Sequence, residues 1–231
     1  MPIALKTPCV AYQALPKAAC SSVKQALAQI DPGVTRPRGG LALSEVHDLY
    51  PTVRFQRRAW DRLAKAWRFC VVRDPARRLM SCYTDIVQGR DALRHSRRLR
   101  RRGDLPLDPD ADTFFINLAR YRVRSSLVKH HALGAELFLG RDFARNYNRV
   151  FRTSELSLLA AELSERSGRW VVMPRANRSE GGLSVHDLSG AAVDAIRPYL
   201  DGEYALLAAY FPNPLGARLY GSCAVPVARV S

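Results

Sequence analysis

Two segments of this chain combine basic and hydroxyl side chains in a pattern that suits the binding of phosphate groups. The first reads ALPKAACSSVK over residues 14–24, and the second reads FCVVRDPARRLMSCY over residues 69–83. Each passes from an apolar, strand-like stretch through a polar turn with a basic residue into the start of a helix. Because the N–H groups and the dipole at a helix N-terminus both favour an anion, each segment predicts a phosphate site. Two such sites in one small chain suggest a ligand with phosphates at both ends.

The first segment has residues that can bind a phosphate and assist a reaction at it. Lys17 follows the strand, where its ammonium can stabilise a bridging oxygen that gains negative charge as a bond to phosphate breaks. The small side chains of Ala18 and Ala19 let the backbone approach an oxyanion, and Ser21 and Ser22 add hydroxyl donors. The pattern G-x-x-x-x-G-K-S/T is absent, which disfavours a Walker-type ATPase. A capped helix with an exposed lysine is the alternative interpretation.

The second segment places an arginine between a strand and a strong helix start. Asp74 can cap the helix and Pro75 suits its first position, so capping is the favoured interpretation of both. Arg73 can hold a phosphate through two parallel hydrogen bonds, and the hydroxyl of Ser81 can add a donor. For Arg78 we favour a structural ion pair over contact with a ligand.

Composition and charge narrow the class of protein. The chain has 231 residues with 47% hydrophobic and 25% charged side chains, which is typical of a globular protein. Its net charge of +15 predicts polyanionic partners. The five cysteines form no Cys-x-x-Cys pair, which favours thiols in a reducing compartment. No apolar stretch reaches the length of a membrane span, so we expect a cytoplasmic protein.

The elements expected to position these residues alternate between strands and helices. This alternation predicts an α/β fold with a central, largely parallel sheet, in a single domain over residues 1–231. The expected strands cover residues 8–15, 68–72, 136–139, 149–152 and 170–173. The expected helices cover residues 21–30, 53–67, 75–88, 112–133, 155–167 and 189–210.

The two segments also resemble motifs of a known family. Residues 16–24 resemble the 5′-phosphosulfate-binding loop of the sulfotransferase family 2 carbohydrate sulfotransferases, the group with the HNK-1 and chondroitin 4-O enzymes. Residues 72–83 resemble the segment of that family that binds the 3′-phosphate. A weaker likeness continues through residues 150–156, 177–179 and 199–211. The resemblance implies a P-loop nucleotide-kinase-like, three-layer fold and 3′-phosphoadenosine 5′-phosphosulfate (PAPS) as the donor. It also implies a hydroxyl of a carbohydrate or glycolipid as the acceptor.

The resemblance further implies roles for individual residues, with no metal among the cofactors. Lys17 would stabilise the leaving phosphate oxygen, while Arg73 and Ser81 would hold the 3′-phosphate. A loop with Asn177 would help to cover the adenosine. The 5′-phosphate would lie against the backbone of Ala18, Ala19, Cys20, Ser21 and Ser22.

Two departures from the family pattern stand out. Ala19 occupies the place of the usual glycine in the first loop. The membrane anchor and stem of the Golgi enzymes are missing, so the chain resembles a soluble, bacterial-type relative.

Transfer to a hydroxyl calls for a general base within hydrogen-bond reach of it. His47 lies between the two binding segments, where related enzymes can place an acceptor-side base, and is the best candidate among five histidines. Glu45 is a competing candidate. His130 and His131 end a predicted helix, where we expect them to interact with its last carbonyl groups.

Residues Arg90 to Arg102 contain seven arginines in a stretch predicted as a basic loop insertion at about 89–110. Such an excess favours contact with an anionic glycan or with an anionic membrane surface, which would place the protein at the inner membrane face. A solvated loop without a partner is the equal alternative interpretation. Nucleic acid is disfavoured, because residues 89–103 contain no aromatic side chain on which bases could stack.

The sequence therefore predicts a PAPS-dependent sulfotransferase, with two alternatives. A kinase-like phosphoryl transferase is disfavoured by the position of the lysine and by the lack of an evident pair of magnesium-binding acids. A non-catalytic polyanion-binding protein would use the same loops without chemistry.

Overall fold

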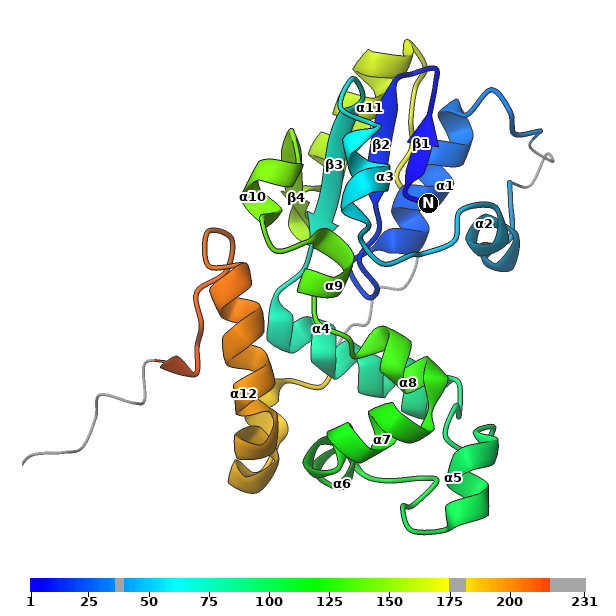
Figure 1. The fold of residues 1–231 in the computed structure, drawn as a ribbon. Coiled ribbons are helices and arrows are strands. Elements are labelled where there is room, and N and C mark those ends of the chain that lie inside the picture. The colour runs from blue at the N-terminus through cyan, green and yellow to red at the C-terminus, as the bar shows by residue number, and fades with distance from the viewer. Residues whose placement is uncertain (36–39, 175–181, 217–231) are drawn as a thin grey trace, which may run out of the picture.

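The centre of the fold is a sheet that is four-stranded within the described residues. The computed structural model describes residues 1–35, 40–174 and 182–216. The strands lie in the order β1-β2-β3-β4, with β1 antiparallel to β2 and the other neighbours parallel. Their bounds are Ile3–Leu5 (β1), Val10–Gln13 (β2), Trp67–Val72 (β3) and Arg149–Arg152 (β4). The prediction of an α/β fold with a largely parallel sheet is confirmed (Figure 1).

Helices cover both faces of this sheet. Successive strand residues point to opposite faces, so Tyr12 and Phe69 pack on one side while Ala11 and Cys70 pack on the other. The first face is covered by α1 (Cys20–Ile30) and α11 (Leu156–Ser167), with α2 (Leu43–Leu49) against α1. The second face is covered by α3 (Arg57–Asp61), α9 (Glu136–Leu139) and α10 (Phe143–Asn146). The result is a three-layer arrangement around the strands (Figure 1).

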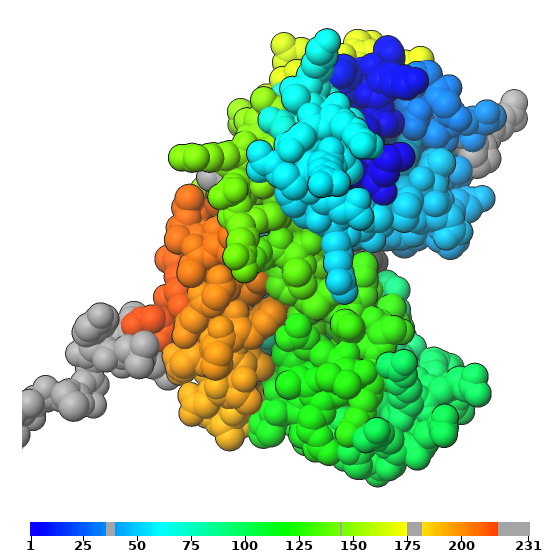
Figure 2. Space-filling model, viewed as in Figure 1, coloured from blue at the N-terminus to red at the C-terminus, as the bar shows by residue number. Residues whose placement is uncertain are grey.

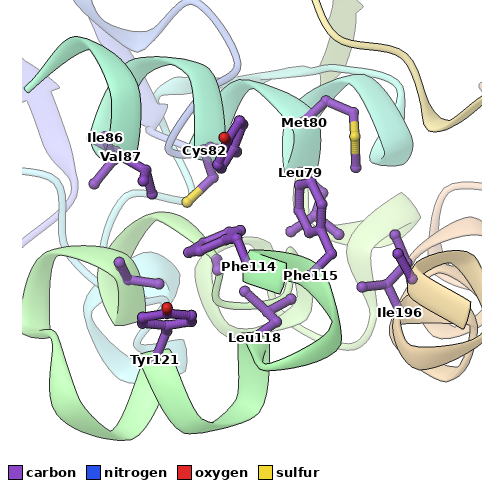
Figure 3. Packing of buried hydrophobic residues seen from close by; sticks show 14 of the residues in the cluster. Leu79, Met80, Cys82, Ile86, Val87, Phe114, Phe115, Leu118, Tyr121 and Ile196 are labelled. Carbon is purple, nitrogen blue, oxygen red and sulfur yellow. The ribbon is translucent and has the colours of Figure 1, made fainter. Parts of the chain in front are cut away.

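A second body of helices packs beside the sheet around its own apolar cluster. Leu79 and Ile86 meet the aromatic rings of Phe114 and Phe115, with Ile196 closing one side (Figure 3). The cluster anchors α4, which follows directly on β3. Its helices are α4 (Pro75–Cys82), α5 (Arg97–Arg102), α6 (Ala111–Ile116), α7 (Leu118–Arg124), α8 (Ser126–His131) and α12 (Gly190–Leu206), with a π-helical segment at Tyr83–Gly89.

Two predicted strands are wrong. Residues Glu136–Leu139 form helix α9, in which Phe138 and Leu139 are buried; a short apolar run does not distinguish a strand from a buried helical turn. Trp170 and its neighbours up to residue 173 belong to no strand. There the backbone N–H and C=O of Val172 pair with the side-chain amide of Gln29 instead of a neighbouring strand.

Several predicted helices are shorter than expected. The helix predicted over residues 53–67 is limited to α3, and the one over 112–133 is three helices, α6, α7 and α8. One break falls at Ser125, whose hydroxyl caps α8 by accepting from the N–H of Val128. The helix predicted over 75–88 becomes π-helical after Cys82. The predictions for α1, β3, β4 and α11 are confirmed to within one residue.

The basic segment is not simply a loop, which corrects the prediction for residues 89–110. Helix α5 forms there because arginine is a good helix former and because Leu99 is buried in the apolar cluster. Gly103, with φ of 65°, ends the helix in the left-handed conformation. The arginines of α5 are exposed at the edge of the molecule away from the sheet (Figures 1 and 2). Within the described ranges, no helix has the length and apolar character needed to cross a membrane.

Candidate active site

A large cavity lies at the carboxyl ends of the parallel strands. Its volume is about 2130 Å³, and its wall includes Lys17 after β2, Arg73 after β3 and Thr153 after β4. Crossover connections bring the carboxyl ends of parallel strands to one edge of a sheet, where α/β proteins commonly bind ligands. Both segments singled out from the sequence therefore meet in one cavity.

The first loop turns sharply so that helix α1 begins at the cavity wall. Lys17 and Ala19 both adopt the left-handed conformation, with φ of 66° and 57°. The N–H of Ala18 donates to the carbonyl of Leu15 at 3.2 Å, while the Ala18 side chain is buried beneath the loop. No side chain of the described residues caps α1, so its first N–H groups remain available to an anion. Cys20, Ser21 and Ser22 line the wall at this helix start.

We expect Ala19→Gly to stabilise the protein by about 1 kcal/mol. A left-handed conformation costs an L-residue about 1–2 kcal/mol relative to glycine, which adopts it freely. Thermal or urea unfolding measures the change. Ala18→Gly is the matched control: Ala18 has no positive φ, so glycine there should destabilise the fold. A loss of stability in Ala19→Gly would contradict the strained loop.

Lys17 is held at the wall by an ion pair. Its ammonium lies 2.7 Å from Oδ2 of Asp85, which belongs to the π-helical segment. Asp85 also pairs with Arg90 at 3.1 Å. Burial raises the pKa of Asp85, but the hydrogen bond and charge of Lys17 together with Arg90 outweigh this, so the pKa falls below its ordinary value. The carboxylate therefore holds the lysine charge at the cavity wall.

His47 lies beside the first turn of α1 with protein groups at both ring nitrogens. Its Nε2 is 2.8 Å from Oγ of Ser21, and its Nδ1 is 3.0 Å from Nζ of Lys24. Burial first, and next the charge of Lys24, lower the pKa of His47, so the ring is neutral near pH 7. His47 lines the cavity, and its role as the base stays a prediction.

The second loop adds an arginine and a serine to the same wall. The guanidinium of Arg73 donates to the carbonyl of Lys17 at 3.2 Å, which ties the two loops together. Burial first, and then Arg77, lower the pKa of Arg73, against the opposing effect of Asp74. The Ser81 hydroxyl donates to the carbonyl of residue 78 at 2.9 Å and lines the cavity with Arg73.

The capping and ion-pair interpretations of this segment are confirmed. Asp74 caps α4 by accepting from the N–H of Arg77 at 2.9 Å. Arg78 is 1% exposed and pairs with Glu203 of α12 at 2.8 Å. Tyr204, next along α12, donates to Oδ2 of Asp74 at 3.0 Å. Helix α12 thus supports the second loop from behind.

The remaining residues that the sequence singled out are one glutamate, two histidines and one asparagine. Glu45 is exposed, accepts from the N–H of Ala42 at 2.7 Å and does not line the cavity. His130 and His131 lie at the end of α8 as expected, and both also line the cavity. Asn177 lies outside the described residues.

Three contributors to the site were missed. Lys24 had no assigned role, although it stands in the recognised motif, and it is fully buried. Asp85 offered no signal beyond its position on a helix next to the second segment. Trp170, predicted in a strand, is 86% exposed and forms part of the cavity wall.

The fold and the site together define an α/β protein whose cavity is lined by basic side chains and by the uncapped N-terminus of α1. The family model described as the sulfotransferase family matches residues 6–184, which is well over half of the chain. The chain therefore belongs to sulfotransferase family 2 and is an enzyme that transfers sulfo groups. Neither the comparison with curated proteins nor the comparison with solved structures gives a match. The described residues contain no group of three or more His, Cys, Asp or Glu side chains arranged to hold a metal ion.

Proposed function

We propose that this sulfotransferase takes the sulfuryl group from PAPS and transfers it to a hydroxyl of a carbohydrate or glycolipid. The observation that carries the proposal is the meeting of two basic loops, each at a helix start, in one cavity, joined by the hydrogen bond from Arg73 to the carbonyl of Lys17. A donor with phosphates at its 5′ and 3′ positions matches two such sites. Sulfotransferases of this family normally use PAPS, and a nucleotide-kinase-like fold fits the three layers.

The proposed donor contacts follow from the two loops. The 5′-phosphate lies against the uncapped N-terminus of α1, with donors from the backbone of residues 18–22 and the hydroxyls of Ser21 and Ser22. The 3′-phosphate lies between Arg73 and Ser81. We retain Asn177 as a proposed contact to the adenosine.

In the proposed reaction, the acceptor oxygen forms a bond to sulfur while the bond from sulfur to the bridging phosphate oxygen breaks. Lys17 exchanges its ion pair with Asp85 for this oxygen, whose negative charge grows as it leaves with adenosine 3′,5′-bisphosphate. The hydroxyl proton passes to a base at the cavity wall. His47, His130 and His131 are the imidazoles that line this wall.

A panel of ligands separates this function from its two alternatives. A ligand that binds only the folded state stabilises it by RT ln(1 + L/Kd), where L is the free ligand concentration, so at equal concentrations the tightest ligand raises the melting temperature most. We expect a marked rise with adenosine 3′,5′-bisphosphate and a smaller one with ATP or short nucleic acids. The strongest rise with ATP would favour a kinase-like enzyme, and the strongest rise with nucleic acid would favour a polyanion-binding protein. Sulfation of a glycan or lipid extract with labelled PAPS then tests the acceptor class.

We expect Arg73→Ala to weaken binding of adenosine 3′,5′-bisphosphate about ten- to a hundredfold, because a charge-assisted hydrogen bond to the 3′-phosphate is lost. Binding of adenosine 5′-phosphate, which lacks that group, should change little. Calorimetry of both ligands measures the difference, and Arg98→Ala, an exposed arginine of α5, controls for the change in net charge. Equal weakening of both ligands would place Arg73 away from the 3′-phosphate.

The basic segment from Arg90 to Arg102 supports a proposal about partners. Within the described residues, the five arginines of α5 form no ion pair with a carboxylate, so their charge is free to meet an external anion. We propose that this segment lies against an anionic acceptor or the anionic membrane surface that carries a glycolipid acceptor.

A further inference from the structure

Lys24 is a charged side chain in an unusual place. It is 0% exposed on α1, one turn after the uncapped helix start, and lysine is almost never fully buried unless it is paired. Its ammonium has two hydrogen-bonding neighbours: Nδ1 of His47 at 3.0 Å and Oγ1 of Thr52 at 2.8 Å. An ammonium has three donors and no acceptor, so both neighbours accept from it.

This contact fixes the proton on the His47 ring. With Nδ1 as the acceptor, a neutral imidazole carries its hydrogen on Nε2. Nε2 lies 2.8 Å from Oγ of Ser21, so it donates and the serine oxygen accepts. The hydroxyl hydrogen of Ser21 is then left to point elsewhere, and Ser21 lines the cavity at the N-terminus of α1. Every hydrogen bond in the sequence Lys24, His47, Ser21 therefore runs toward the cavity.

We infer that Lys24 and His47 are positioning residues that hold the Ser21 hydroxyl as a fixed donor to the donor substrate's 5′-phosphate. The inference rests on the proposed function for the identity of the anion. Hydrogen bonds that all run in one direction polarise one another, so the buried ammonium strengthens the final donor although it touches no ligand. A hydroxyl that is already oriented also needs no reorganisation when the anion binds.

In the Lys24–His47–Ser21 chain, His47 positions Ser21, and this role replaces the prediction that His47 is the acceptor base. Its Nδ1 lone pair is taken by Lys24, and its Nε2 carries a hydrogen, so neither nitrogen is open to a hydroxyl proton. His131 differs, because its Nδ1 is buried with no hydrogen-bond partner among the described residues, on the wall of the same cavity.

The first experiment reads the His47 tautomer in the free protein by ¹⁵N NMR of the ring. We expect the Nε2–H form in the wild type and a loss of this preference in Lys24→Met, which cannot donate. An Nδ1–H tautomer in the wild type would overturn the inference whether or not any nucleotide binds. Lys6→Met, at an exposed lysine outside the cavity, is the matched control.

The second experiment is a double-mutant cycle with adenosine 3′,5′-bisphosphate as the calorimetric probe. Ser21→Ala and Lys24→Met should each weaken binding about tenfold, the loss of one charge-assisted hydrogen bond. The double variant should bind no more weakly than Ser21→Ala alone, because Lys24 acts only through Ser21. Losses that multiply would show that the ammonium acts directly on the anion and would overturn the inference.

A second variant, His47→Phe, guards against misfolding of Lys24→Met, which alters a fully buried side chain. His47→Phe removes the middle residue of the chain at a half-buried position. It should weaken bisphosphate binding in the wild-type background but not in the Ser21→Ala background. A wild-type protein that does not bind the bisphosphate would refute the proposed function, and the NMR result would still decide whether the chain exists.

Discussion

Replacing Lys17 by alanine is expected to lower turnover by a factor on the order of a hundred or more while the fold stays intact. Removing a preorganised group that stabilises charge developing in the transition state typically costs this much. Lys17 is the cation that the first loop places at the cavity. Its backbone is left-handed, in the turn that precedes α1. Turnover with PAPS and melting temperature, measured together, separate a lost catalytic charge from a lost fold.

Asp85 provides the control for this experiment. In Lys17→Ala it keeps Arg90 as a partner at 3.1 Å, so the variant leaves no isolated carboxylate. Asp85→Asn removes the competing carboxylate but leaves the lysine charge, so it should retain turnover far better than Lys17→Ala does. If Lys17→Ala turned over at the wild-type rate, Lys17 would have no part in the transfer.

The parts of the fold that were predictable have strong local signals. Asp74 and Pro75 mark the start of α4 by their chemistry alone, and residues 69–72 form an unbroken apolar run. By contrast, residues 136–139 form helix α9, whose Phe138 and Leu139 pack on one face of the sheet. The local sequence does not indicate this long-range contact. The break at Ser125 within residues 112–133 did have a local signal, because the serine hydroxyl caps the helix that follows it.

In the candidate site, too, some residues have local sequence signals while other contacts depend on long-range packing. Lys17, Ser21 and Arg73 stand beside helix starts, so their approach to one cavity followed from the parallel order of the strands. The ion pair of Lys17 with Asp85 joins residues 68 positions apart, and its geometry depends on the π-helical turn after α4. Nor does a sequence motif reveal that Lys24 is buried against His47, because α2 must first pack on α1.

The second large effect is expected at Glu203, which lies beyond the residues matched by the family model. Its carboxylate accepts from Arg78 at 2.8 Å and from the N–H of Ala135 at 2.8 Å, and it is 5% exposed. Glu203→Ala leaves the Arg78 charge buried without its partner, which should cost about 3–5 kcal/mol in the free energy of unfolding. Urea unfolding measures this loss.

Two further variants decide whether the loss of stability in Glu203→Ala comes from the unpaired charge of Arg78. Asp61→Ala breaks an exposed ion pair with Arg57 and should cost at most about 0.5 kcal/mol. The double variant Arg78→Met with Glu203→Leu removes both charges and should recover much of the stability lost in Glu203→Ala, since well-packed apolar side chains can replace a buried ion pair. No recovery would mean that Glu203 matters for its contact with residue 135.

Glu203→Ala should also weaken binding of the bisphosphate. Tyr204, on the same helix as Glu203, donates to Asp74, which precedes α4 and follows Arg73. Loss of α12 packing should therefore disturb Arg73, and α12 would then be part of the support of the donor site.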